Sequence, residues 1–83
     1  MDQKDQLFVE QLLQDLQSVD AFTKISAAKE LRLLSWSNEQ IVTALEKVAL
    51  SDINKHVVLA ARETLDAPVH QEVLKQLGPR PIA

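Results

Sequence analysis

Apolar and polar residues follow one another along the first part of the chain with a helical spacing. Between Asp5 and Gln17, polar residues separate a set of five apolar ones, which are Phe8, Val9, Leu12, Leu13 and Leu16. Spacings of one and three residues place this set on one face of a helix. The pattern therefore predicts an amphipathic helix over 5–17 with a polar outer face.

The same spacing recurs along the rest of the chain. It predicts further helices over 21–34, 38–50, 55–65 and 68–77. Gly78 is the one glycine, and with Pro79 it forms a stop signal for the last helix. Because hairpin turns usually need glycine, its scarcity argues against an all-β fold. We expect an all-α fold of about five helices, with residues 1–79 as a single domain and 80–83 as a flexible tail.

Residues between the predicted helices have the side chains that cap helix starts. Asp20 or Thr23 could cap the second helix, and Asn54 the fourth. Ser37, followed three residues later by Gln40, has the spacing of a capping box for the third. Two apolar pairs also have the spacing of a hydrophobic staple, and these are Trp36 with Ile41 and Ile53 with Val58.

Two segments of the chain are similar to each other. Each starts with an Asp at a turn and continues with a β-branched residue, an Ala-Ala pair, a basic residue and Glu. Asp20 and Asp52 are 32 residues apart, and the alanine pairs 27–28 and 60–61 are 33 apart. Such a period is typical of helical repeat proteins. The small alanines predict helix faces that a neighbouring helix can approach closely.

On these residues the chain resembles the HEAT-repeat family. The segment 45–65 is the most similar, with a leucine-rich first helix, a turn Asp, Val, an Ala-Ala pair and Leu. The resemblance covers 9–77, which corresponds to two repeats and the first helix of a third. It implies a short α-solenoid of antiparallel helix pairs, with first helices outside and second helices inside. The family often has Arg just after the valine, where this chain has Ser26 and Val58. Neighbouring repeats in the family are tied by a ladder of Asp and Arg side chains, and this chain lacks the Arg at both positions.

Composition narrows the class of protein further. The 83 residues include no Cys, so the fold depends on packing, and a cysteine-based zinc site is excluded. A net charge of −3 argues against nucleic-acid binding and against anchoring to an acidic membrane. The start lacks the basic flank and apolar stretch of a signal peptide, and the longest apolar run is 57–61. We expect a cytoplasmic protein that does not enter the membrane.

The sequence offers little catalytic chemistry. With Gly78 as its one glycine, the sequence has neither a Gly-rich phosphate loop nor a serine elbow. His56 and His70 have no metal-ligating partner four residues on, where Ala60 and Leu74 stand, and we expect both histidines at the surface or its boundary. Carboxylates in this number are typical of solvated helix faces. We therefore expect no enzyme activity, no cofactor and no metal.

Basic residues give the strongest indication of a binding surface. Five of the nine lie in the second and fourth predicted helices, whereas the first helix has only acidic charges. Lys29 and Arg62 each follow an alanine pair, so they should occupy equivalent places one repeat apart, where a partner with acidic side chains could bind. Trp36 is a hot-spot candidate as well as a staple. The residues expected to contact a partner are Lys29, Arg32, Trp36, Lys55, Leu59 and Arg62.

The first hypothesis is therefore a non-enzymatic module that binds a protein or peptide. The alternative is a structural protein that self-associates and buries Leu74 and Leu77 between copies. Nucleic-acid binding on the basic face ranks below both, since net charge and the lack of aromatic stacking residues oppose it.

Overall fold

Five α-helices make up the described part of the chain. The computed structural model describes residues 3–78, in which the helices are α1 (Gln3–Asp15), α2 (Ala21–Arg32), α3 (Glu39–Ser51), α4 (Lys55–Leu65) and α5 (Pro68–Leu77). No strand occurs in this range. The all-helical fold expected from the periodicity is confirmed. The expected tail at 80–83 lies outside the described residues.

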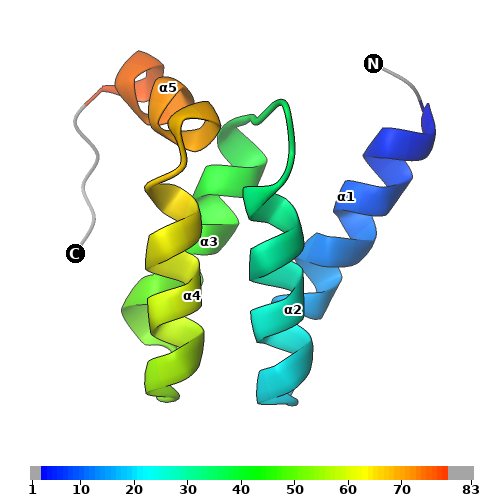
Figure 1. The fold of residues 1–83 in the computed structure, drawn as a ribbon, viewed down its shortest axis with the longest axis vertical. Coiled ribbons are helices and arrows are strands. Elements are labelled where there is room, and N and C mark those ends of the chain that lie inside the picture. Colours follow the sequence, from blue (N-terminus) through cyan, green and yellow to red (C-terminus); the bar gives the residue numbers. More distant parts are fainter. Residues whose placement is uncertain (1–2, 79–83) are drawn as a thin grey trace.

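The helices form a thin slab with extents of 31 × 30 × 17 Å. α2 and α4 lie side by side and run in the same direction, both starting at the lower edge of Figure 1. α1 packs against α2, and α3 packs against α4. α5 lies at the upper end of the slab, where it contacts α3 and α4 (Figure 1). One broad side of the slab is thus built from α2 and α4.

An aliphatic core fills the space between the first four helices. Each contributes one apolar stripe, as amphipathic helices do, and Leu31, Ile41 and Leu45 are among the side chains with no exposed surface. Burial of this kind contributes about 25 cal/mol per Å² of apolar surface. Phe8, which was expected on the apolar face of α1, is exposed, and so is Leu7, which makes the outer face of this helix less polar than expected.

The alanine pairs lie where helices approach closely. Ala27, Ala28, Ala60 and Ala61 are all buried. The buried hydroxyl of Thr64 lies 2.8 Å from the backbone carbonyl oxygen of Ala28, in the neighbouring helix α2. A short side chain can reach another helix's backbone only where the two helices are close, and the small alanines permit this distance. The close approach predicted from the sequence is confirmed.

Helix starts are capped by Asp20, Asn38 and Asn54. Asp20 accepts the backbone N–H of Thr23, and Asn54 accepts those of His56 and Val57, as expected. For α3 the prediction was wrong by one residue. Asn38 Oδ1 accepts the backbone N–H of Ile41 at 2.9 Å, so the capping box of Ser37 with Gln40 does not form. The cause is a long-range contact, because the Ser37 hydroxyl is 2.7 Å from a ring nitrogen of His70.

Neither predicted staple forms as proposed. With Asn38 as the cap, Trp36 no longer occupies the position next to the cap, and it packs half-buried against the core. Ile53 is 99% exposed and so covers nothing. Its neighbour Asp52 accepts the backbone N–H of Asn54 and binds Lys24, which holds the turn with Ile53 facing outward.

His70 is buried, which corrects the expectation of a surface histidine. Its side chain has no exposed surface and bonds to Leu31 and Ser37, at the junction of α2 and α3. α5 can place it there because Pro68 opens the helix right after α4 ends, which turns the chain back over the core. α5 ends at Gly78, whose φ of +72° favours glycine. Leu74 and Leu77 are half-buried.

Candidate functional site

Two open hollows on the broad side of the slab are the features that suggest a site. Groups of three or more His, Asp or Glu side chains that could bind a metal do not occur in residues 3–78. No helix in that range has the length and apolar character needed to cross a bilayer. The two hollows share Leu59 of α4 as a lining residue.

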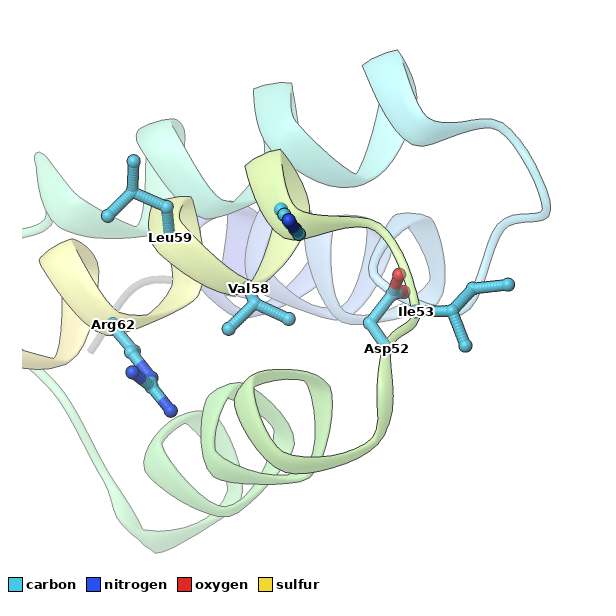
Figure 2. Close-up of a pocket in the computed structure, with 6 residues that line it drawn as sticks. Asp52, Ile53, Val58, Leu59 and Arg62 are labelled. Atoms are coloured by element: carbon cyan, nitrogen blue, oxygen red, sulfur yellow. The ribbon is translucent and has the colours of Figure 1, made fainter.

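The first hollow lies where α4 meets the turn before it. Figure 2 shows Val58, Leu59 and Arg62 projecting from α4, and Asp52 and Ile53 from the turn. Its volume is about 340 Å³. The complete lining is Asp52, Ile53, Lys55, Val58, Leu59 and Arg62. Three apolar side chains are thus surrounded by three charged ones.

The second hollow lies between α2 and α4 and has a volume of about 410 Å³. Its lining is Phe22, Ile25, Lys29, His56, Leu59, Ala60 and Glu63. On α4, positions 55, 58 and 62 turn to one flank of Leu59, and positions 56, 60 and 63 turn to the other. Leu59 therefore forms a ridge between the two hollows. We call the residues that line either of the two hollows, taken together, the α2–α4 face.

Large apolar side chains are exposed on this face. The exposed fractions are 80% for Phe22, 99% for Ile53 and 55% for Leu59. Phe22 is exposed because Asp20 caps α2 just before it and the core side of the helix falls at Ala27, Ala28 and Leu31. Single exposed apolar residues are ordinary, but apolar residues that gather around hollows mark interaction sites in many soluble proteins.

Positive charge surrounds the exposed apolar side chains. Lys29, Lys55 and Arg62 are exposed, and none of them forms an ion pair with any residue that the structure describes. Glu63 is the one carboxylate of the second hollow. The first hollow has Asp52, but Lys24 neutralises it. The face therefore has an excess of positive charge in a chain whose net charge is −3.

The Lys24–Asp52 ion pair defines one edge of the face. Lys24 Nζ lies 2.5 Å from Asp52 Oδ2, and both side chains are largely shielded from solvent. The hydrogen bond from Lys24 lowers the pKa of the Asp52 carboxyl, and the hydrogen bond from the Asn54 backbone adds to this. Asp52 is thus ionised at neutral pH and occupied by partners within the chain. It has little remaining capacity to bind a cation from outside.

The structure brings four of the six expected contact residues together. Lys29, Lys55, Leu59 and Arg62 line the two hollows. Arg32, exposed at the end of α2, and Trp36, in the α2–α3 connection, line neither of them. Sequence reasoning also missed several lining residues, chiefly Phe22, Ile25, Ile53, His56 and Glu63. The signal for Ile53 was present but was interpreted as a staple. Phe22 stands three residues before Ile25 on α2, a spacing that by itself indicates a shared apolar face and gives no sign of exposure.

The fold and the face together describe a small helical protein with an exposed apolar and basic surface. No protein-family model, no curated protein and no solved structure matches the chain.

Proposed function

We propose that this protein is a non-enzymatic interaction module that binds a protein or peptide partner through its α2–α4 face. One observation supports this most directly: Phe22, Ile53 and Leu59 are exposed around two hollows and lie beside three cations with no partner in the described chain. Interfaces combine an apolar centre with a polar rim, and this face has both.

The proposal includes a HEAT-like arrangement of the helices. α1 with α2 and α3 with α4 would be two stacked helix pairs, with α2 and α4 as the inner helices. The repeat of 32–33 residues and the contact between α2 and α4 support this. The position of α5 at the upper end of the slab argues for two repeats and a closing helix, in place of the start of a third repeat.

A capture experiment with matched charge variants tests the function. The tagged wild type is compared in cell lysate with Lys29→Glu/Arg62→Glu and with the control Lys47→Glu/Lys75→Glu, which makes the same charge change outside the two hollows. We expect a protein that the wild type and the control retain and that the face variant loses. Equal capture by all three proteins would contradict the proposed surface, provided that their circular dichroism spectra agree.

Self-association is the second candidate, and one observation favours it. Leu50 is 57% exposed and lines a further hollow of about 200 Å³ beside Ala49, Arg62 and Leu65. A second copy could cover this surface, with the half-buried Leu74 and Leu77 of α5 as additional candidates. Sedimentation over a range of concentrations tests self-association. A monomer mass that stays constant excludes this function and leaves the first proposal intact.

A further inference from the structure

We propose that the partner presents to the α2–α4 face a short amphipathic helix with acidic residues along its flanks. This inference rests on the proposed function and specifies the chemistry of the partner. Three properties of the face support it: the kinds of side chain in its lining, its shape around Leu59 and its unbalanced charge.

The lining favours a helix over an extended segment. Neither hollow is lined by an Asn, Gln, Ser or Thr side chain, and the lining backbone lies mainly in helices, whose own hydrogen bonds occupy it. An extended peptide would lose water from its N–H and C=O groups on docking and find few replacements. An extended peptide usually gains replacement hydrogen bonds from the edge of a β-sheet, and residues 3–78 contain no strand. A helix satisfies its own backbone and can bury one apolar face.

The shape around Leu59 suits a helical partner. The hollows on its two flanks measure about 340 and 410 Å³. At about 30 Å³ per water they are equivalent to roughly 11 and roughly 14 waters, which is room for an apolar side chain in each. On a helix, residues three or four apart lie on the same face with Cβ atoms about 5–6 Å apart. Two such residues could straddle Leu59, one in each hollow, as helix ridges pack into grooves.

The charges favour acidic flanks on the partner. Lys55 and Arg62 lie at the first hollow and Lys29 at the second, while Glu63 is the carboxylate without an ion pair among the lining residues. Glu or Asp on the partner would meet three cations, and the planar guanidinium of Arg62 can bind a carboxylate with two hydrogen bonds. Beside Glu63, a partner carboxylate would be repelled, so we expect a neutral or basic residue there.

Selection from a random peptide library tests this partner chemistry. A displayed library of peptides about four helical turns long, roughly 14–15 residues, is panned on the wild type and counter-selected on Leu59→Lys. Leu59→Ala serves as a second, milder variant, and because Leu59 is exposed both should fold. We expect enriched peptides with net negative charge and with apolar residues at i and i+3 or i+4, which become helical on binding.

Measured affinities then check the charge argument. A synthetic copy of an enriched peptide should bind Lys29→Glu/Arg62→Glu at least tenfold more weakly than wild type, and Lys47→Glu/Lys75→Glu with nearly unchanged affinity. Added salt should weaken wild-type binding. Leu59-dependent peptides that are basic, or that bind in an extended conformation, would overturn the inference and leave the interaction function standing. If no peptide depends on Leu59, the inference and the proposed function of this face both fail.

Discussion

The imidazole Nε2 of His70 lies 2.9 Å from the backbone carbonyl oxygen of Leu31, 39 residues earlier in the chain. A carbonyl oxygen can only accept, so Nε2 has the proton and donates it. In the neutral ring Nδ1 then accepts from the Ser37 hydroxyl, 2.7 Å away. Desolvation by burial lowers the pKa of His70, and the bond to Leu31 offsets this only in part. One neutral side chain thus ties α5 to the end of α2.

This contact predicts that the protein loses stability in mild acid. The pKa of His70 is 6.5 in the unfolded reference and lower in the folded protein. As the pH falls below about 6.5, the unfolded chain binds a proton that the folded chain does not, so the free energy of unfolding decreases. The decrease ends once the pH is below the lowered pKa. Urea unfolding followed by circular dichroism between about pH 7.5 and pH 5 measures it.

Variants at the two histidines separate this effect from other titrations. His70→Gln should be less stable than wild type at neutral pH, and its stability should depend less on pH in this range. His56→Gln changes an exposed histidine and should keep the wild-type dependence. Asp20 and Asp52, whose pKa values are lowered from 3.8, lose their contributions only below about that pH. A wild-type free energy of unfolding that is constant down to pH 5 would count against a neutral His70.

The start of α3 provides a second prediction. Asn38→Ala removes the side chain that accepts the Ile41 backbone N–H, and should lower the free energy of unfolding by about 1 kcal/mol. Ser37→Ala leaves the cap intact but removes the hydroxyl bonded to His70. The loss of unfolding free energy caused by Ser37→Ala should therefore be smaller in a His70→Gln background than in the wild type. The loss caused by Asn38→Ala should be the same in the wild type and in His70→Gln. If Ser37→Ala is additive with His70→Gln, the two side chains are not coupled.

Local patterns in the sequence were sufficient to predict the helices, two of their caps and the burial of the alanine pairs. Apolar spacing depends on positions within one helix, which is why the order of the five helices was predictable. Asp20 and Asn54 were recognisable as caps because a cap acts within three residues. Lys29 and Arg62 were identified as candidates because each follows one of the two alanine pairs that repeat along the chain, and Lys55 because it is a basic residue of the fourth predicted helix.

The errors concern residues whose positions depend on distant parts of the chain. His70 is buried by its contacts with Leu31 and Ser37, which are 39 and 33 residues away, and no spacing within α5 indicates this. The same contact occupies Ser37 and moves the cap of α3 to Asn38. Ile53 faces outward because Asp52 binds Lys24, 28 residues away. Such pairings become evident only once the helices are placed in three dimensions.

Close packing between α2 and α4 gives a third prediction. Ala28 and Ala61 have almost no exposed surface, so a larger side chain at either position must displace its neighbours. Ala28→Leu and Ala61→Leu should each lower the free energy of unfolding by about 1–3 kcal/mol, despite the added apolar surface. Glu30→Leu, at an exposed position of α2, is the control and should change it by less than about 0.5 kcal/mol. Thermal unfolding of the three variants ranks their stabilities. An Ala28→Leu variant as stable as the wild type would contradict the close contact between α2 and α4.

The ion pair between Lys24 and Asp52 joins α2 to the turn before α4 and gives the fourth prediction. Lys24→Met keeps the aliphatic stem, and Asp52→Asn keeps an oxygen that can accept the Asn54 backbone N–H. A double-mutant cycle should give a coupling of up to about 1 kcal/mol, at the upper end for such pairs because both groups are shielded. Since pairing lowers the pKa of Asp52, the coupling should be full above about pH 3.8 and lost as the pH falls through the lowered pKa. A coupling near zero at neutral pH and low salt would mean that the turn is held by Asn54 and the surrounding packing alone.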